Sequence, residues 1–415
     1  MPGHGLKLGR ALRHRNFRLY FTGQGISLIG TWLTRFAIGY ATYVLSHSTW
    51  QLGLVSFFSQ APTSLIAPIA GALVDRWNRH RTIVITQVFA LAQSSALAAF
   101  AITGTLTVWH LMVLGAIQAV INAFDMPARQ SFLRQMVEDR ADLPNAIALN
   151  SSLFNGARIA GPTIAAALVS LVGIGWCFAI DAASFLAVIV SLVIMNVPPQ
   201  PVRPPTSHGV LGEIRDGLRY VYGLPLVFGL LLLLTVTSTL GGAYASLLPA
   251  VAGDTFGGGA RELGWLMGAG GAGALVGALY LANGTKIARL PAIAARCGIW
   301  LGAGLIALEL APSVWIAVPM LFVVGLAIIV MWAATNTLVQ TLVDDAMLGR
   351  VMSLYAMAFF AGAPIGALVE GALARVVGPI HALALAGVGC LACGLAFRRA
   401  LPRLEARTRA LGVTF

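Results

Sequence analysis

The fold of this chain is decided by the stretch Gly71-Ala72-Leu73-Val74-Asp75-Arg76-Trp77-Asn78-Arg79-His80-Arg81. The 25 residues from Trp50 to Val74 carry no charge, and a second apolar run follows Arg81. Placing an arginine at the centre of a bilayer costs about 2.5–3.5 kcal/mol on insertion scales. The charged segment therefore belongs at the water surface, between two membrane helices.

Composition indicates that most of the chain faces lipid or other helices. Of the 415 residues, 58% are hydrophobic and 10% are charged, and the mean hydropathy is +0.83. A soluble domain carries about 25% charged residues. These values predict a membrane protein.

The sequence predicts twelve spans, each long enough to cross a hydrocarbon core of about 30 Å. Their ranges are 17–45, 50–74, 82–103, 109–127, 146–172, 176–197, 226–250, 263–282, 291–311, 315–336, 350–373 and 380–401. With the N-terminus in the cytoplasm, all but four of the 27 Lys and Arg residues (Arg35, Arg158, Arg261 and Arg375) lie on the cytoplasmic side. This imbalance predicts that both termini are cytoplasmic, and it assigns the net charge of +12 to membrane orientation, so we expect no nucleic-acid partner.

A proline-rich break at residues 197–209 divides the spans into six and six. We predict an N-terminal six-helix bundle over 1–197, a cytoplasmic linker with an amphipathic helix over 198–222, and a C-terminal six-helix bundle with a cytoplasmic tail over 223–415. The halves repeat each other, since the triplet Gly71-Ala72-Leu73 recurs as Gly277-Ala278-Leu279. The expected fold class is an all-α membrane protein with twelve transmembrane helices in two pseudo-symmetric six-helix bundles.

The charged stretch resembles the signature loop between the second and third helices of the major facilitator superfamily. The matching residues are Gly71, Leu73, Asp75, Arg76, Arg79 and Arg81, and Asn78 stands where the family usually has glycine. In that family the loop is a charge latch that helps to set which side of the transporter is open. The resemblance therefore implies a gating loop of Gly71, Asp75, Arg76, Arg79 and Arg81. The alternative is an ordinary basic cytoplasmic loop.

Further stretches resemble the branch of this superfamily that includes the enterobactin and macrolide exporters. They are Phe124–Ser131, Leu143–Ser151, Phe154–Pro162, Asn336–Gln340 and Leu348–Ser353. The resemblance extends over nearly the whole chain. It implies the major facilitator fold, export, and a bacterial inner membrane, but it does not identify the cargo.

Gly156, Gly161 and Pro162 form a helix-kink motif in the fifth span. Proline removes a backbone donor and glycine lets helices approach, so this span is expected to bend and to pack closely. In exporters of the superfamily a Gly-rich, Gly-Pro motif in this helix is associated with efflux. The match is partial because Ala165 and Ala166 replace the usual following glycines, and a purely structural kink is the alternative.

Polar residues follow one face of the first span. They are Gln24, Ser27, Thr31, Arg35 and Thr42, which fall within about 60° of arc. The fourth span has a similar stripe of Gln118, Asn122 and Asp125, and Asp125 is expected to pair with Arg129, four residues on. Because these spans line the central cavity in the family, the resemblance implies a water-filled path for substrate.

Deeply placed charges are the other candidates for substrate binding and coupling. Arg35 lies about 27 Å and Asp181 about 24 Å from the inner ends of their helices, so the two are expected to meet. Arg158 lies about 18 Å deep and shares a helix face with Asn155. It either bonds amides and carbonyls or presents its charge to an anionic substrate.

The other reactive residue types have ordinary explanations. The sequence contains no Walker loop, catalytic-triad spacing or metal-ligand cluster, so we expect no enzyme activity, no metal and no cofactor. Cys390 and Cys393 are expected to be packing residues, and Glu309 and Glu370 to be hydrated near outer helix ends. The proton gradient is the expected energy source, with Asp181 as the carboxylate that carries the proton.

The sequence therefore predicts a secondary active transporter that exports small amphiphilic or anionic compounds, as in multidrug efflux, by alternating access coupled to proton entry. One alternative is a dedicated siderophore exporter, favoured if Arg35 and Arg158 face the cavity without an acid partner. Another is a lysophospholipid flippase, which needs a lateral opening lined by apolar groups. The expected partners are a small-molecule substrate and membrane lipid, and the protein is expected to be a monomer.

Overall fold

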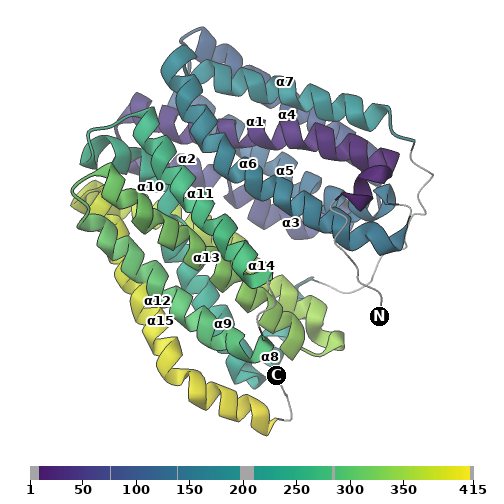
Figure 1. Cartoon of the computed structure of the whole chain (residues 1–415), viewed down its shortest axis with the longest axis vertical. Helices are drawn as coiled ribbons and strands as arrows, with labels where there is room; N and C mark the ends of the chain where they lie inside the picture. The colour runs from purple at the N-terminus through teal and green to yellow at the C-terminus, as the bar shows by residue number, and fades with distance from the viewer. Residues whose placement is uncertain (1–8, 75, 138, 197–209, 283–285, 412–415) are drawn as a thin grey trace. The chain divides into compact units, whose positions relative to one another are not determined.

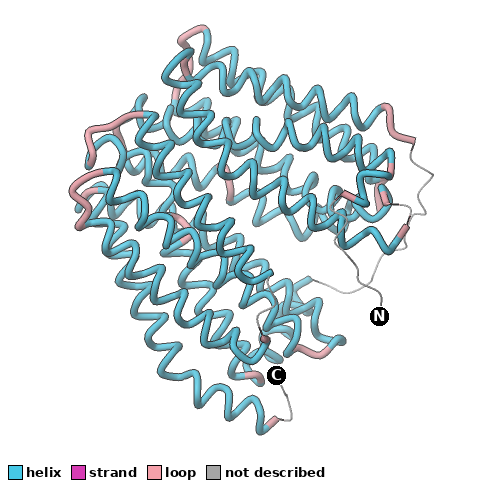
Figure 2. The backbone as a smooth tube through the Cα atoms, viewed as in Figure 1, coloured by secondary structure: helices cyan, strands magenta, loops and turns pink. Residues whose placement is uncertain are grey.

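The computed structural model describes residues 9–74, 76–137, 139–196, 210–282 and 286–411, and these residues form helices and loops without a strand (Figures 1 and 2). Ten helices of this part of the chain are long and apolar enough to cross a membrane. Those ten are Arg79–Ile102, Val108–Leu133, Leu143–Val172, Ile174–Val193, Pro225–Thr255, Ala260–Ala282, Ile287–Glu309, Val314–Leu342, Asp345–Val377 and Pro379–Ala410. The predicted all-α membrane fold is confirmed.

The first two predicted spans account for the difference between ten and twelve. Helix α1 (Arg15–Ser46) covers the first span and carries its polar stripe. The second span is divided at Ser59 and Gln60 into α2 (Thr49–Phe58) and α3 (Ala61–Val74), each too short to cross a membrane alone. The count of twelve therefore stays a prediction.

The chain forms two compact units that do not follow chain order. Unit 1 comprises Met1–Ala41 and Pro62–Pro205, and unit 2 comprises Thr42–Ala61 and Thr206–Phe415. Helix α1 thus begins in unit 1 and ends in unit 2, while α2 packs within unit 2.

Unit 1 contains most of α1 together with α3, α4 (Arg79–Ile102), α5 (Val108–Met136), α6 (Leu143–Val172) and α7 (Ile174–Val193), besides the short 3-10 helices η1 (Arg10–Arg13) and η2 (Arg140–Asp142). Helix α4 packs between α5 and α7. An apolar core near the start of α1 includes Phe17, Tyr20, Ile83, Phe132, Met136 and Leu192. This core holds the helices that surround the polar residues described below.

Local chemistry sets where two of these helices begin. Asn78 accepts a hydrogen bond from the backbone N–H of Arg81 at 3.0 Å, which caps the start of α4. Thr107 caps α5, and His110 bonds back to the backbone of Thr107. The charged stretch of the sequence is therefore a turn followed by a capped helix.

Unit 2 contains α2, α8 (Val210–Gly223), α9 (Pro225–Val236), α10 (Tyr244–Ala250), α11 (Ala260–Ala282), α12 (Leu290–Glu309), α13 (Val314–Leu342), α14 (Asp345–Val377) and α15 (Pro379–Ala410). Helix α12 packs between α13 and α15, α11 packs on α13, and α2 packs on α14. Glycines permit the close contacts: a Cβ on Gly302 would overlap Leu391 of α15, and one on Gly325 would overlap Gly270 of α11.

The seventh predicted span is irregular. Two π-helical segments, η3 (Thr237–Gly241) and η4 (Val251–Thr255), flank α10. π-Helical turns are uncommon and occur frequently at functional sites. This places an irregular backbone beside α14 and α15 in unit 2.

Helix α8 lies where the sequence predicts an amphipathic helix. Arg215, Asp216 and Arg219 are exposed, and Gly217 lies against the backbone of Arg350 on α14. The proline-rich break at 197–209 lies outside the described residues.

Candidate functional site

The predicted gating loop is described only in part, because Asp75 lies outside the described residues. Arg76 and Arg81 are exposed, and Arg79 is half-buried. A Cβ on Gly71 would meet nothing within 4 Å. The charge-latch role of the loop stays a prediction.

His80 anchors this loop to the rest of unit 1. Its Nε2 lies 2.8 Å from the backbone oxygen of Leu192 on α7, and its ring lies 5.7 Å from that of Phe132 on α5. His80 was not among the predicted site residues. Its side chain connects the start of α4 to two neighbouring helices.

A buried polar network joins α4 and α5 around Asp125, which is 9% exposed. One carboxylate oxygen accepts hydrogen bonds from Thr86 Oγ1 at 2.7 Å and from Gln87 Nε2 at 3.0 Å, and the other accepts from Arg129 Nε. The predicted pairing of Asp125 with Arg129 is confirmed. Each charge thus has a partner of opposite sign, as a buried ion pair in a membrane helix requires.

Arg129 extends the network to α1. Its Nη1 donates to Gln24 Oε1, and its guanidinium also hydrogen-bonds the hydroxyl of Tyr20. Gln24 and Asp125, predicted on separate helices, are therefore connected through a single arginine.

Asp181 of α7 is a second buried acid of unit 1, at 2% exposure. Its Oδ2 accepts a hydrogen bond from Ser94 Oγ on α4 at 2.9 Å, while its Oδ1 has no hydrogen-bond partner among the described residues. A Cβ on Gly30 of α1 would stand 2.7 Å from Oδ1, so the glycine leaves the space that the carboxylate occupies. Asp181 is thus buried without a cation, beside the hydroxyls of Ser94 and Thr34.

The expected pair of Arg35 and Asp181 is wrong. Arg35 lies over the ring of Trp32, with 5.1 Å from its guanidinium carbon to the ring centroid, and the nearby charge that acts on it is another cation, Arg158. Neither arginine forms an ion pair with a carboxylate of the described residues. The residue of α1 that lies against Asp181 is Gly30, five residues and about 7.5 Å along the helix from Arg35. The side chain of Arg35 remains exposed, although protein atoms crowd it.

The other predicted polar residues bond mainly within their own helices. Gln118 Nε2 donates to Asn122 Oδ1 at 3.1 Å, and Thr31 and Asn155 each donate to the backbone carbonyl four residues earlier, at 3.0 and 2.9 Å. Thr31 is exposed, and the buried Oε1 of Gln118 has no partner among the described residues. These residues do not join the Asp125 network.

The helix-kink motif lies on α6, which continues without a break through Pro162. A Cβ on Gly161 would overlap Trp32 of α1, so this glycine is needed for close helix packing. A Cβ on Gly156 would meet nothing within 4 Å. Close packing thus involves only one of the two glycines.

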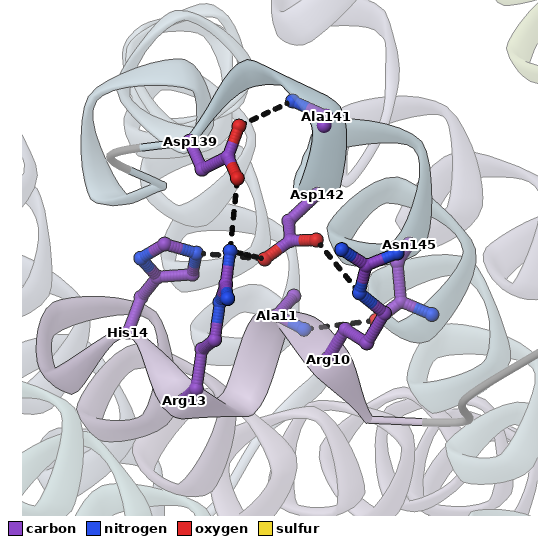
Figure 3. Close-up of polar contacts among 8 residues, drawn as sticks. All are labelled: Arg10, Ala11, Arg13, His14, Asp139, Ala141, Asp142 and Asn145. Atoms are coloured by element: carbon purple, nitrogen blue, oxygen red, sulfur yellow. Dashed lines mark hydrogen bonds and ion pairs between the residues drawn. The ribbon is translucent and has the colours of Figure 1, made fainter.

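A charged cluster connects η1 to η2 at the start of α6 (Figure 3). Asp142 is 1% exposed. Its Oδ2 lies 2.8 Å from Arg13 Nη2 and 3.0 Å from His14 Nε2, and its Oδ1 lies 3.3 Å from Arg10 Nε. Arg13 also contacts Asp139 at 2.9 Å. Burial raises the pKa of the Asp142 carboxyl, but the His14 hydrogen bond and the charges of Arg13 and Arg10 lower it more, so this pKa lies below its ordinary value.

Two acids of unit 2 were expected to be hydrated near helix ends. Glu309 is partly exposed and contacts His381 Nδ1 at 2.7 Å. The expectation for Glu370 is wrong, because this residue of α14 is 1% exposed. Helix α2 packs on α14 in unit 2, and the order of residues along the chain does not show this contact.

Several residues of these networks were missed by sequence reasoning, and the third span carried a signal for them. Thr86-Gln87 and Gln93-Ser94 are polar pairs seven residues apart on α4. Seven residues are about two helical turns, so the pairs share one face. Both residues of the first pair contact Asp125, and Ser94 of the second pair contacts Asp181. Within the described residues, no group of three or more His, Cys, Asp and Glu side chains is arranged to hold a metal ion.

Comparison with known proteins agrees with this architecture. A family model described as "Transmembrane secretion effector" matches residues 10–411. The enterobactin exporter EntS of Shigella boydii serotype 18 is 28% identical over 398 residues, which cover 94% of this chain and 92% of that protein. The same exporter of Shigella flexneri is 27% identical and also covers 94% of this chain and 92% of that protein.

Solved transporter structures share the fold at low sequence identity. A mutant of the peptide transporter POT in complex with sulfate has a TM-score of 0.76 at 14% identity, covering 94% of this chain and 95% of that one. A bacterial homologue of the human lysosomal transporter Spinster has a TM-score of 0.72 at 16% identity, covering 95% and 98%. The match to the family model and these folds together show that the chain belongs to the transmembrane secretion effector family of the major facilitator superfamily.

Proposed function

We propose that this protein is a proton-coupled exporter of small amphiphilic or anionic compounds that works by alternating access. Its curated relatives are exporters by name, and the superfamily consists of transporters with small-molecule substrates. In this proposal the protein is a monomer in a bacterial inner membrane, with both termini in the cytoplasm. It has no enzymatic activity and needs no cofactor, because the proton gradient supplies the energy.

The observation that carries the proton coupling is the setting of Asp181. Its carboxylate is 2% exposed and lies beside the hydroxyls of Ser94 and Thr34 without a cation. An ionised carboxylate in such a place is costly, whereas the protonated form is not. A side chain of this kind binds a proton while enclosed and releases it when water enters. Asp125 is less suited to this role, because Arg129 compensates its charge.

The experiment uses purified protein in liposomes that contain a pH-sensitive dye, with enterobactin as the probe. We expect enterobactin to drive proton movement through the wild-type protein, and Asp181→Asn to abolish it while enterobactin still exchanges across the membrane. Glu309→Gln is the matched control, since this acid is partly exposed and paired with His381. Undiminished proton movement in Asp181→Asn, or none in the wild type, contradicts the proposal.

A dedicated siderophore exporter is the second candidate, and the arginines of unit 1 favour it. Arg35 and Arg158 interact electrostatically with each other and lack a carboxylate partner among the described residues. Two such cations are suited to a polyanionic cargo, because a bound anion relieves their repulsion. This reading assigns Arg158 to the cargo rather than to helix packing.

Replacing Arg158 distinguishes these two roles. A hydrogen bond to a charged group contributes about 1.5–3 kcal/mol, so Arg158→Gln is expected to weaken enterobactin transport about 10- to 100-fold. Transport of a cationic dye is expected to remain, and Arg375→Gln, at an exposed site on α14, is the control. Equal losses for the anion and the cation would assign Arg158 a structural role.

A further inference from the structure

Glu370 on α14 is a buried acid without a structural explanation. It is 1% exposed, and neither Oε1 nor Oε2 has a hydrogen-bond partner among the described residues. Buried polar groups in proteins are nearly always hydrogen-bonded, and buried charges are paired. An unpaired carboxylate at this position is therefore tolerated only as the neutral acid.

No cation of the helices around α14 faces Glu370. Helices α2, α9 and α13 and the segment η3 contain no titratable residue, and α10 contributes only Tyr244. On α15, Cys390 lies near Glu370, His381 pairs with Glu309, and the arginines begin at Arg398, eight residues and about 12 Å beyond Cys390. The Asp254 carboxylate of η4 accepts a hydrogen bond from Tyr43.

The remaining charges on α14 and α8 are distant or exposed. Helix α8 meets α14 near Arg350, twenty residues and about 30 Å along the helix from Glu370. Arg375 is exposed. The charge of Glu370 is thus left without compensation from any described neighbour.

Glu370 is enclosed by helix contacts that contain almost no side chains. One turn earlier on the same face, a Cβ on Gly366 would overlap the backbone oxygen of Thr239 in η3. On the adjacent face, Gly371 lies against Gly53 of α2, and Thr49 Oγ1 donates to the Gly371 carbonyl at 3.2 Å. Glu370 therefore lies on the face of α14 that η3 covers, next to the face that α2 covers.

Only a short path separates this acid from the end of its helix. Glu370 is seven residues, or about 10 Å, from Val377 at the end of α14. Parting of η3 from α14 would therefore open the carboxylate toward that end. In the packed arrangement the acid is closed off.

We propose that Glu370 is a second proton-binding site of the transport cycle, loaded while η3 packs on its face of α14 and released when the two segments part. This inference rests on the proposed proton coupling and adds to it a carboxylate in unit 2, besides Asp181 in unit 1. The ligand is a proton, and no other group takes part. One proton is carried on the Glu370 carboxyl and is given up to water.

Infrared spectroscopy of the purified protein in water and in D2O tests the protonation directly and needs no cargo. In an Asp181→Asn background at neutral pH, a carboxylic-acid C=O band is expected to remain, and adding Glu370→Gln is expected to remove it. Adding Glu309→Gln instead leaves the band in place. The inference is overturned if the band survives in the double variant Asp181→Asn, Glu370→Gln. It is also overturned if the band is already missing in the single variant Asp181→Asn.

Liposome transport separates this inference from the proposed function. Because Gln resembles the neutral acid in shape, Glu370→Gln is expected to fold with unchanged thermal stability and to retain exchange of the probe used above, while losing transport driven by a pH gradient. If the wild type shows no gradient-driven transport, the proposed function fails. If the pH gradient drives transport by the wild type and Glu370→Gln keeps that full response, Glu370 is not a coupling site.

Discussion

At the scale of single residues, the buried acids of this protein differ in how their charges are compensated. Asp125 has Arg129 and two neutral donors, Thr86 and Gln87, around its carboxylate. Removing one partner from a buried ion pair costs about 3–5 kcal/mol, because the other charge is left uncompensated. Asp181 and Glu370 have no such partner. The paired acid is therefore suited to hold helices together, and the unpaired acids are suited to change protonation.

The cluster around Asp142 leads to a prediction about pH. The pKa of this carboxyl is lower in the folded protein than its ordinary value of 3.8, so its contribution to stability is complete above pH 3.8 and is lost as the pH falls through the folded-state pKa. We expect Asp142→Asn to lower the thermal unfolding midpoint of the purified protein at neutral pH. The difference from the wild type should shrink below pH 3.8 and then vanish.

The neighbouring acid provides the control for this prediction. Asp139 has a side chain 50% exposed and contacts only Arg13 among the described cations, so Asp139→Asn should lower the midpoint less. A difference between Asp142→Asn and the wild type that stays constant from neutral to acidic pH would show that the ion pairs of Asp142 do not contribute as described.

At the scale of helices, glycine determines which pairs of helices approach closely. In unit 2, Gly53 of α2 and Gly371 of α14 allow two backbones to touch, and a Cβ on Gly53 would stand 2.5 Å from the backbone oxygen of Ala367. In unit 1, Gly161 of α6 serves the same purpose against Trp32 of α1. Such contacts are stabilised by van der Waals packing, which small residues make possible in membranes.

The contact between α2 and α14 predicts opposite outcomes for two glycine substitutions. Gly53→Ala places a methyl group against backbone atoms and is expected to destabilise the protein by about 1–3 kcal/mol, as overpacking does. Gly156→Ala on α6 meets open space and is expected to be neutral or to stabilise by up to about 1 kcal/mol, because alanine favours a helix. Thermal unfolding of both variants measures the difference. Equal midpoints for the two would contradict the packing described for α2.

At the scale of the whole molecule, hydropathy predicted the positions of most helices. Runs of apolar residues and the charges between them act locally, so each of the ten long helices overlaps a predicted span, although α5, α13 and α15 extend six to nine residues beyond the predicted ends. The division of the second span into α2 and α3, and the two π-helical segments around α10, were not visible in composition. Those breaks depend on packing against neighbouring helices.

The candidate sites were predicted less completely than the fold. Gln24, Asp125 and Asp181 were found because polar residues in apolar helices are conspicuous. Their partners on α4 belong to polar pairs seven residues apart, a spacing that places both pairs on one helix face and could have been recognised in the sequence. The direction of Arg35 and the burial of Glu370 were not predictable in this way, since depth along a helix does not specify which neighbour covers which face.

The sequence by itself determined that this chain is a helical membrane protein, because the cost of placing charge in lipid acts on each segment separately. It also determined the family, through the loop around Asp75 and the stretches that resemble exporters. Only the tertiary structure decided which buried carboxylates have partners. That property depends on distant segments meeting, as α1, α4 and α7 do at Asp181 and as α2 and α14 do beside Glu370.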